Sequence, residues 1–397
     1  MRILIDGRHL TRPPYSGVGE YTTQLLRALF SISTQDTFTI LTTGRARLPD
    51  GLLGPLPQNV SVRHVPVPNR LLTLSMAAAG KPTLDALAVR PAAGQARGPA
   101  PTETARFDVA FMPNLAVGAP SARVPYVVML HDLSWKLFPT FYPARMRLWH
   151  HLVRPARLLG GAAAVLTPSA HAARDAARLL GLPPERLRAM PHGVNPAFQP
   201  RALPTDSGVR SRLRLPRRFA LSVGSLEPRK NLVAAVDAVA AYRARTRDDL
   251  RFVLAGPRGW NTDALEARLR RADARAFARR LGPVSRDDLA ALYRMADVLL
   301  WPSIYEGFGL PVLEAMASGL PVITSHASSL PELALDAAVL VNPFDQAEIA
   351  AALEEVMGSD ALRARMRTRG LARAAAFTWE SSARATLAAL REAAQAS

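Results

Sequence analysis

The chain has 397 residues and a mass of 42.9 kDa, which exceeds the usual size of one domain and favours two. Hydrophobic residues make up 49% and charged residues 21%, a balance that excludes a largely disordered or fibrous protein. The net charge of +18 suits phosphate, nucleic-acid or anionic-membrane partners, but 47 of the 50 basic residues are arginines, which codon bias explains equally well. The absence of cysteine excludes disulfides and thiolate metal sites.

The N-terminal half alternates short apolar runs with helical patterns. The apolar runs predict strands at Arg2–Asp6, Phe38–Thr42, Val60–Val65, Asp108–Met112, Val124–His131 and Ala163–Thr167. Apolar residues at helical spacing predict helices at Gly19–Ser31, Pro143–Leu159 and Ser169–Leu180. Residues 92–104, rich in Ala, Gly and Pro, predict a flexible surface loop. This alternation is typical of parallel βαβ units.

After a turn-rich stretch at 196–216, the alternation starts again. Strands are predicted at Phe219–Val223, Arg251–Ala255, Asp297–Trp301, Val322–Thr324 and Val339–Val341, and a final amphipathic helix at Thr378–Ala396. We therefore expect an α/β protein with an N-terminal Rossmann-like domain over 1–200, a C-terminal one over 201–377, and a helix over 378–397 that packs back towards the first domain. Doubly wound sheets bind ligands beyond the carboxyl ends of their strands, which predicts a ligand shared by two domains facing across a cleft.

The N-terminus predicts a buried strand instead of a signal peptide, and no apolar run reaches the length of about 18 residues that a membrane span needs. These features favour a cytoplasmic enzyme. The stretch 141–159 mixes arginines with Leu148 and Trp149 in a helical pattern, which suits docking at the inner face of an anionic membrane. The alternative is a helix that packs its apolar face on the sheet and leaves its arginines in water.

The most informative stretch is SIYEGFGLPVLEAMASG at 303–319, which follows an apolar strand. Gly307 and Gly309 allow a tight turn, and a proline directly after Leu310 suits the first turn of a helix. The free N–H groups around Phe308, Gly309 and Leu310 would hold phosphate or sugar oxygens at the helix N-terminus.

Glu306 precedes this turn and Glu314 is expected in the first turn of the helix, eight positions later. One carboxylate would accept hydrogen bonds from sugar hydroxyls and the other from a ribose diol. The alternative is that Glu314 complements the helix dipole and Glu306 is solvated. The stretch resembles the E-x7-E signature of family 4 glycosyltransferases, which implies the two-domain GT-B fold and retaining sugar transfer.

The segment VGSLEPRKNL at 223–232 resembles the diphosphate loop of the same family. Gly224 and Ser225 would then lie beside the donor, and Arg229 and Lys230 would neutralise its phosphates as the glycosidic bond breaks. A solvated pair in a strand-to-helix loop is the alternative. Several family members have an arginine directly after the glycine of this loop, where this chain has Ser225. The chain therefore has one cation fewer near the diphosphate, and Arg229 is a candidate to replace it.

In the N-terminal half, the segment at 12–21 resembles the family's glycine loop, in which Gly17 and Gly19 would let the backbone approach the donor or acceptor. A GxGxxG dinucleotide motif is excluded because Thr22 occupies the third position; an ordinary βα turn remains the alternative. His131 ends an apolar strand, and the resemblance implies that it contacts the transferred sugar. A structural histidine is the other interpretation.

Two further segments match the base-binding side of the family's donor pocket, AGPRGW with Gly256 and LGPVS with Val284. The segment PHGVN at 191–195 resembles the end of the first domain, and SSLPEL at 328–333 is interpreted mainly as a helix cap.

The family mechanism implies that the donor phosphate leaves on the face from which the acceptor hydroxyl attacks and takes its proton. His131, Glu306 and Lys230 are the residues expected to act at the reacting centre. The sequence contains no Asp-x-Asp pattern, so we predict metal-independent transfer and no cofactor.

Similar enzymes are often mannosyltransferases, so GDP-mannose is the expected donor and a glycan or lipid-linked hydroxyl the expected acceptor. UDP-glucose, UDP-N-acetylglucosamine and dTDP-rhamnose are alternative donors. A non-catalytic binding protein for nucleic acid or acidic polysaccharide is the alternative class, disfavoured by scattered arginines and 6% aromatic residues. A GT-B phosphorylase or epimerase is a third alternative.

Overall fold

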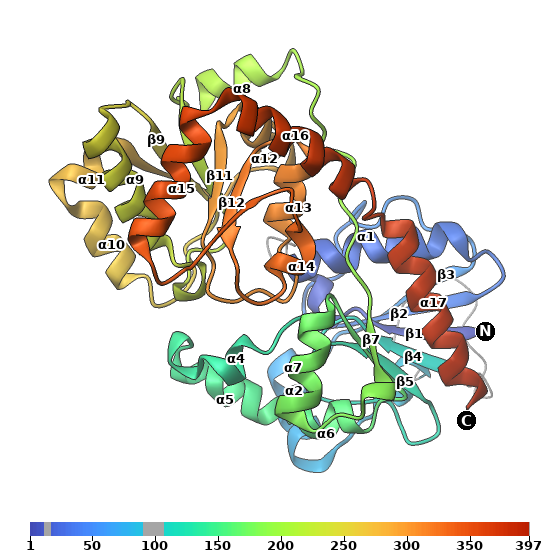
Figure 1. Cartoon of the computed structure of the whole chain (residues 1–397). Coiled ribbons are helices and arrows are strands. Elements are labelled where there is room, and N and C mark those ends of the chain that lie inside the picture. The colour runs from blue at the N-terminus through green and yellow to red at the C-terminus, as the bar shows by residue number, and fades with distance from the viewer. Residues whose placement is uncertain (12–16, 90–106, 397) are drawn as a thin grey trace. The chain divides into compact units, whose positions relative to one another are not determined.

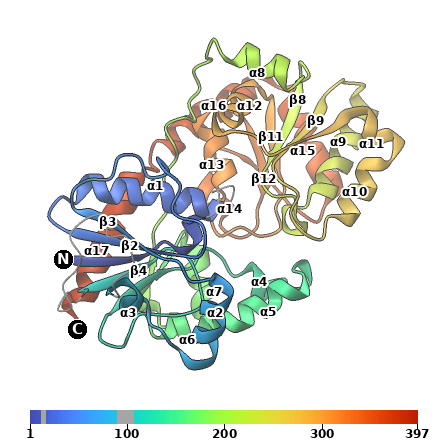
Figure 2. The ribbon, with the colours of Figure 1, turned by 180° about the vertical axis from the view of Figure 1, so that it is seen from behind.

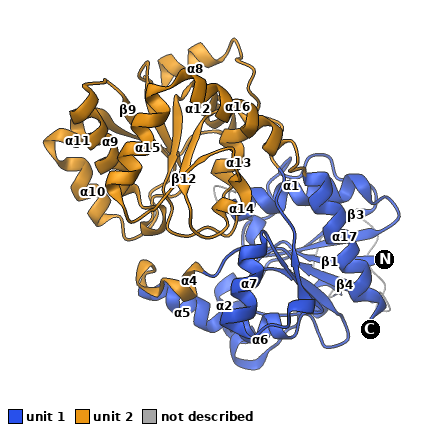
Figure 3. Cartoon of the chain, viewed as in Figure 1, with its two compact units in different colours: residues 1–133, 144–193, 379–397 blue, residues 134–143, 194–378 orange. Residues whose placement is uncertain are grey.

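The computed structural model describes residues 1–11, 17–89 and 107–396. The loop expected at 92–104 lies outside these residues, as does most of the glycine loop before Gly17. The chain divides into two compact units, which Figure 3 colours separately. Unit 1 comprises Met1–Leu133, Ala144–Gly193 and Trp379–Ser397, and unit 2 comprises Ser134–Pro143 and Val194–Thr378.

The described part of unit 1 contains a seven-stranded sheet in which all neighbouring strands are parallel, in the order β3-β2-β1-β4-β5-β6-β7 (Figure 1). Its strands are β1 (Arg2–Asp6), β2 (Thr37–Thr43), β3 (Val60–Val65), β4 (Val109–Met112), β5 (Tyr126–Met129), β6 (Ala164–Thr167) and β7 (Leu187–Ala189). The central strands are buried on both faces, which explains why they are continuous apolar runs in the sequence.

Helices cover both faces of this sheet (Figure 2). They are α1 (Gly17–Ile32), α2 (Asn69–Ala79), α3 (Leu84–Val89), α5 (Ala144–Val153), α6 (Pro155–Gly160), α7 (Ala170–Leu180) and α17 (Trp379–Gln395), with short 3-10 turns η1 (Arg8–Thr11) and η3 (Pro184–Arg186). The C-terminal helix α17 buries Leu387 and Leu390 in one core cluster with Leu25 of α1 and Val127 of β5. The last helix of the chain is therefore part of unit 1.

Unit 2 contains a six-stranded parallel sheet in the order β10-β9-β8-β11-β12-β13. Its strands are β8 (Phe219–Val223), β9 (Arg251–Ala255), β10 (Ala278–Gly282), β11 (Val298–Trp301), β12 (Val322–Ser325) and β13 (Val339–Val341). Two Rossmann-like α/β units of this kind confirm the GT-B fold class expected from the sequence.

Helices connect the strands of unit 2, and two further helices precede β8. They are α4 (Ser134–Leu137), α8 (Asp206–Arg212), α9 (Leu232–Thr246), α10 (Asp263–Arg270), α11 (Ala272–Phe277), α12 (Arg286–Met295), α13 (Leu310–Ala317), α14 (Leu330–Ala334), α15 (Gln346–Gly358) and α16 (Asp360–Ala374), with 3-10 turns η2 (Pro139–Phe141) and η4 (Pro228–Lys230).

Residues 134–143 were expected in the first domain, but the structure groups them with unit 2. The ring of Tyr142 stacks on that of Trp260 at 5.6 Å between centroids, and Asn261 Nδ2 donates a hydrogen bond to the Phe141 carbonyl oxygen. These contacts join residues that are distant in the sequence, so no periodic pattern of apolar residues predicts them.

Three details of the predicted elements are corrected by the structure. The strands β7 and β10 were not predicted; both are edge strands with exposed arginines and lack an apolar run. The single helix expected at 143–159 is two helices, because α5 ends at Val153 and Pro155 opens α6. Proline cannot donate the backbone hydrogen bond that a continuous helix requires, and Arg154 between them has a φ of 49°.

Candidate active site

The strand order of unit 2 reverses between β8 and β11, which lie side by side although four α-helices and two strands separate them in the chain. The connection from β8 leads to β9 on one side, and the connections from β11 lead to β12 and β13 on the other. The carboxyl ends of strands at such a reversal are the usual ligand-binding position of α/β sheets. The loops after β8 and β11 contain most of the residues predicted from the sequence.

The loop after β8 begins with a close contact between two glycine backbones. Gly224 has a φ of 114° and Gly256, at the end of β9, has a φ of 144°. A Cβ atom on Gly256 would lie 2.1 Å from the Gly224 carbonyl oxygen, so any larger residue would push the two strand ends apart. Close packing against Gly224 therefore requires glycine at position 256, independently of the base-binding role expected for this segment. Ser225 follows Gly224 and is partly buried.

Backbone and side-chain hydrogen bonds join the loop after β8 to the loop after β11. The carbonyl oxygen of Arg229 accepts from the Ile304 amide at 2.9 Å and from Ser303 Oγ at 3.0 Å. Asn231, in the left-handed region with a φ of 55°, donates through Nδ2 to the carbonyl oxygens of Pro302 and Pro343. The sequence analysis missed Asn231, although asparagine adopts the left-handed region more readily than most residues other than glycine.

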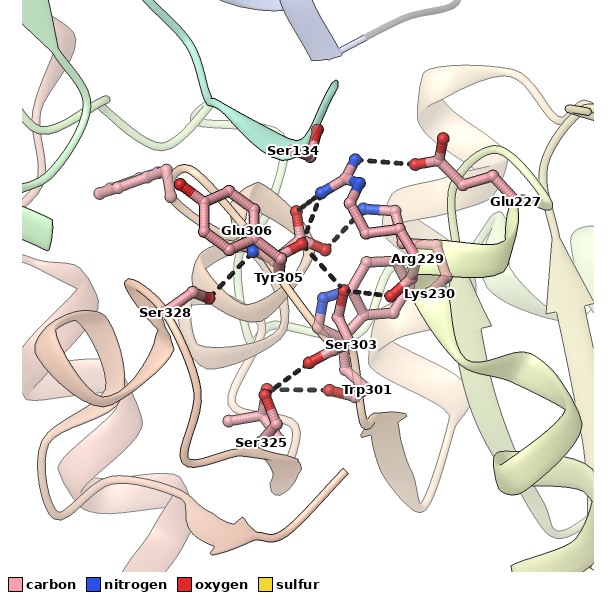
Figure 4. Close-up of polar contacts among 12 residues, drawn as sticks. Ser134, Glu227, Arg229, Lys230, Trp301, Ser303, Tyr305, Glu306, Ser325 and Ser328 are labelled. Carbon is pink, nitrogen blue, oxygen red and sulfur yellow. Dashed lines mark hydrogen bonds and ion pairs between the residues drawn. The ribbon is translucent and has the colours of Figure 1, made fainter. Parts of the chain in front are cut away.

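Four charged side chains form a buried cluster across these two loops (Figure 4). Lys230 Nζ lies 2.6 Å from Glu306 Oε1, and Arg229 Nη1 lies 2.7 Å from Glu306 Oε2. Arg229 Nη2 also lies 2.7 Å from Oε1 of Glu227, a residue that the sequence analysis did not single out. Glu227, Lys230 and Glu306 are all less than 9% exposed, and Lys230 Nζ lies 4.6 Å from the Trp301 ring centroid. The cluster therefore holds Glu227, Lys230 and Glu306 out of water, with Arg229 partly exposed at its edge.

The two sequence hypotheses of a solvated Glu306 and a solvated Arg229–Lys230 pair are wrong for this structure, because these side chains bond one another in a buried position. Burial alone would raise the pKa of Glu306, but the charges of Arg229 and Lys230 outweigh burial and lower it to about 2. Burial and the neighbouring Arg229 lower the pKa of Lys230, against the opposite effect of Glu306. Glu306 is consequently a carboxylate at neutral pH and accepts hydrogen bonds only.

The helix α13 starts directly after Gly309, whose φ of 109° lies in the left-handed region. The side chain of Phe308 is buried against that of Phe377. In the expected mode of binding, Phe308 would therefore contact a ligand through its backbone only. The turn is fixed by two serines: Ser328 Oγ accepts from the Glu306 amide, and Ser329 Oγ donates to the carbonyl oxygens of Glu306 and Phe308. These serines were interpreted mainly as a helix cap, but their side chains make no capping hydrogen bond to α14.

Glu314 lies in the second turn of α13, one turn later than expected from the sequence. It is buried, and its Oε2 accepts a hydrogen bond of 2.8 Å from the hydroxyl of Tyr293, which belongs to α12. Leu310 opens α13 and Val284 packs at the margin of the core of unit 2. Gly307 is buried within the turn. The donor-binding roles of these four residues stay predictions.

His131 follows β5 in unit 1 and is partly buried beside aromatic rings. Its Nε2 donates a hydrogen bond of 2.9 Å to the Pro113 carbonyl oxygen, and its ring meets the edge of Tyr21 at 4.8 Å between centroids. Burial lowers the pKa of His131 to about 4. The imidazole is thus neutral at pH 7, with the proton on Nε2 and an acceptor lone pair on Nδ1.

The two glycines proposed for a loop in unit 1 lie inside a helix. α1 begins at Gly17, which is exposed, and includes Gly19, which is buried. The helix starts two residues earlier than predicted, which brings its first amides to the position where the loop was expected. Any contact of these glycines with a donor or acceptor stays a prediction.

The low pKa of His131 predicts a loss of stability in mild acid. The unfolded chain takes up this proton near pH 6.5 and the folded chain only at about 4, so the free energy of unfolding falls as the pH decreases across this window. The loss attributable to His131 is about 3 kcal/mol. Urea unfolding of the wild type and of His131→Gln at about pH 7 and about pH 4.5 measures it. An equal loss in both proteins would contradict the assignment.

Among the described residues, no group of three or more His, Cys, Asp and Glu side chains is arranged to hold a metal ion. Within the same part of the chain, none of the helices has the length and apolar character needed to cross a bilayer.

Comparisons with known proteins agree with this architecture. Residues 209–373 match the family model described as Glycosyl transferases group 1, and residues 15–198 match that of Glycosyltransferase Family 4. The chain is 33% identical over 256 residues to O-antigen chain mannosyltransferase B of Escherichia coli. The aligned region covers 64% of this chain and 67% of that protein. It is 27% identical over 275 residues to the serotype-specific mannosyltransferase WbdA of Escherichia coli, which covers 67% of this chain but only 34% of that protein.

Among solved structures, the chain resembles the Anabaena protein HepE in complex with UDP and glucose, with a TM-score of 0.70 and 19% identity over 99% of this chain and 100% of that chain. Fold and sequence together therefore define a glycosyltransferase with a GT-B architecture. The chain belongs to family 4 of these enzymes, as the E-x7-E stretch and the loop at 223–232 predict.

Proposed function

We propose that the chain is a retaining glycosyltransferase that transfers a hexose, with mannose from GDP-mannose as the best candidate, to a hydroxyl of a glycan or lipid-linked acceptor. Two relatives named as mannosyltransferases support the choice of sugar, one of them acting on an O-antigen chain by its name. The proposed place of the reaction is the inner face of the membrane, in the assembly of a polysaccharide.

The observation that carries this proposal is the buried cluster of Arg229, Lys230 and Glu306 at the reversal of the strand order, beside the N-terminus of α13. A pyrophosphate placed there would meet the cations of Arg229 and Lys230 and the first amides of α13. These groups would stabilise the negative charge that develops on the leaving nucleotide as the glycosidic bond breaks. Their positions are fixed before the donor arrives, because hydrogen bonds join both loops.

Glu306 and His131 have complementary tasks in this mechanism. Glu306, ionised at neutral pH, accepts hydrogen bonds from hydroxyls of the transferred sugar and does not act as a general acid. The neutral His131 ring accepts a hydrogen bond from a hydroxyl group through the lone pair of Nδ1. Because the ring is uncharged, it does not oppose the positive charge of an oxocarbenium-like centre. The acceptor oxygen bonds to the anomeric carbon while its proton passes to the leaving phosphate, so that no protein nucleophile is needed.

The proposed transfer requires no metal ion, since cations of the protein face the phosphates. The donor base is the least constrained part of the proposal: Gly256 and Val284 are expected on the base side and offer backbone groups, which do not by themselves select guanine over uracil or thymine. A binding protein without turnover remains the alternative of a different class.

Thermal-shift titration tests the donor. A ligand that binds only the folded state raises the melting temperature, by an amount equivalent to about 2.7 kcal/mol at a hundredfold excess over Kd. GDP-mannose is expected to stabilise the protein more than UDP-glucose, UDP-N-acetylglucosamine or dTDP-rhamnose, and to do so equally in EDTA. Preference for another donor would correct the sugar or base; no stabilisation by any of the four, with salt-sensitive nucleic-acid binding, would favour the binding protein. Loss of transfer in EDTA that Mn²⁺ restores would overturn metal independence.

A further inference from the structure

Helix α5 in unit 1 does not pack its apolar face on the sheet, contrary to one of the two interpretations of its sequence. Leu148 is 59% exposed and Trp149 is 39% exposed, and Val153 is the one residue of this helix that is buried. Two large apolar side chains on a single short helix are thus left in water. The second interpretation, in which this helix meets another surface, agrees better with these exposures.

Helix α2 of the same unit shows the same feature independently. Leu71 and Leu74 are 62% and 61% exposed, whereas Leu72 and Met76 are buried and hold the helix on the unit. The exposed leucines are three positions apart and so lie on the same face of the helix. This helix was not predicted from the sequence.

The two helices lie at neighbouring strand ends of the unit 1 sheet. Met76 of α2 is 3.4 Å from Arg8 Nη1, directly after β1, and its sulfur fills the space beside Gly118, shortly after β4. His150 of α5 is close enough to Asp132, directly after β5, for that charge to affect its pKa. Since β1, β4 and β5 are consecutive in the sheet, α2 and α5 share its carboxyl edge, as Figures 1 and 2 both draw them.

Positive charge predominates in the two sequence stretches that contain these apolar side chains, although Asp132 lies close to His150 of α5. No acidic residue occurs at 51–84, which includes α2, or at 133–174, which includes α5. The exposed arginines and lysines that unit 1 has in these two stretches are Arg70, Lys81, Arg145, Arg147, Arg154, Arg157 and Arg174. None of these seven forms an ion pair with a carboxylate of the residues that the structure describes, whereas arginines of unit 2 such as Arg268 and Arg294 do.

We propose that the exposed faces of α2 and α5, defined by Leu71, Leu74, Leu148 and Trp149 with the surrounding basic residues, form a docking surface for an anionic lipid bilayer. Apolar side chains that enter the headgroup region, flanked by arginines that meet anionic lipids, are the physical requirements of interfacial binding. A protein partner would equally cover the leucines, but seven cations without internal partners fit a surface of uniform negative charge best. The proposal rests on the proposed function only for its purpose, which is to bring a lipid-linked acceptor to the carboxyl edge of this sheet.

Vesicle co-sedimentation of the full chain tests the surface. The probe is unilamellar vesicles of phosphatidylcholine containing about one third phosphatidylglycerol, compared with pure phosphatidylcholine. We expect binding to the anionic vesicles to exceed binding to the neutral ones at least about tenfold. The double variant Leu74→Ser/Leu148→Ser and the double variant Arg145→Gln/Arg147→Gln are each expected to reduce the partition coefficient by about tenfold or more. These side chains are exposed, so the variants should keep the melting temperature of the wild type.

Matched controls lie in unit 2. Phe344→Ser removes a side chain that is 73% exposed, and Arg270→Gln/Arg275→Gln removes two exposed charges that pair with no carboxylate of the described chain. Both controls should bind vesicles like the wild type. Equal binding of all variants, or equal binding to neutral and anionic vesicles, would overturn the proposal. A third outcome would also overturn it: heparin binding that depends on Arg145 and Arg147, combined with vesicle binding that does not depend on the leucines. This combination would identify a site for a soluble polyanion.

The vesicle assay contains no donor and no acceptor, which separates it from the test of the proposed function. Vesicle binding without stabilisation by any nucleotide sugar would leave the surface in place and refute the donor. Stabilisation by GDP-mannose without vesicle binding would leave the enzyme in place and refute the surface.

Discussion

Lys230→Met is expected to lower kcat/KM for the nucleotide sugar by about 10² to 10³, equivalent to about 3 to 4 kcal/mol of transition-state stabilisation. Methionine has a similar length and is apolar, so it keeps the contact with the Trp301 ring but removes the charge that would meet the leaving diphosphate. Glu306 keeps its bond to Arg229 in this variant, which should limit the loss of stability. Steady-state kinetics with GDP-mannose, or with the donor that thermal shift identifies, gives the comparison.

Two further variants make this result specific. Lys230→Arg restores the charge with a different shape and should recover part of the lost kcat/KM, because the fork of a guanidinium does not replace a point charge at the same position. Arg270→Met, on the exposed end of α10, removes a cation far in sequence from the cluster and should leave the kinetics unchanged. If Lys230→Met retained wild-type kcat/KM, the diphosphate would be bound elsewhere.

The sequence predicts the buried strands of both sheets because parallel strands covered on both faces are continuous apolar runs, as in VLLW of β11. It fails at the sheet edges, where β10 has the sequence ARRLG and is stabilised by pairing with β9, not by burial of its side chains. The split between α5 and α6 was predictable in principle, since Pro155 interrupts the helical pattern.

Within the candidate site, the local motifs around Lys230 and Glu306 indicated which residues matter but not that they bond each other. Their ion pair joins residues 76 positions apart and depends on β8 and β11 being neighbours in the sheet. The hydrogen bond from Asn231 to the Pro302 carbonyl oxygen is equally invisible in a linear sequence, because it depends on the same pairing of strands. The ion pair of Glu227 with Arg229, by contrast, is local to the loop after β8. Resemblance to a family supplied the missing step, from residue types to a shared site.

Glu306→Gln should reduce the free energy of unfolding by about 3 to 5 kcal/mol at neutral pH, the usual result of removing one partner from a buried ion pair. The amide leaves Arg229 and Lys230 with a single nearby anion, Glu227. The pKa of Glu306 is lowered from 4.5 to about 2, so its stabilising charge is fully present above pH 4.5 and is lost only as the pH falls through about 2. Urea unfolding at about pH 7 therefore measures the whole effect.

The same variant should bind free GDP more tightly than the wild type does, while it transfers sugar more slowly. In the wild type the Glu306 carboxylate repels the diphosphate and holds both cations; the neutral amide removes the repulsion and frees them. Glu314→Gln supplies the matched comparison, since Glu314 bonds Tyr293 and is proposed to accept from the ribose, which predicts weaker GDP binding. Calorimetric titration of GDP into both variants distinguishes these opposite signs. Weaker binding in Glu306→Gln would mean that Glu306 holds the cations in place for the phosphates and does not compete for them.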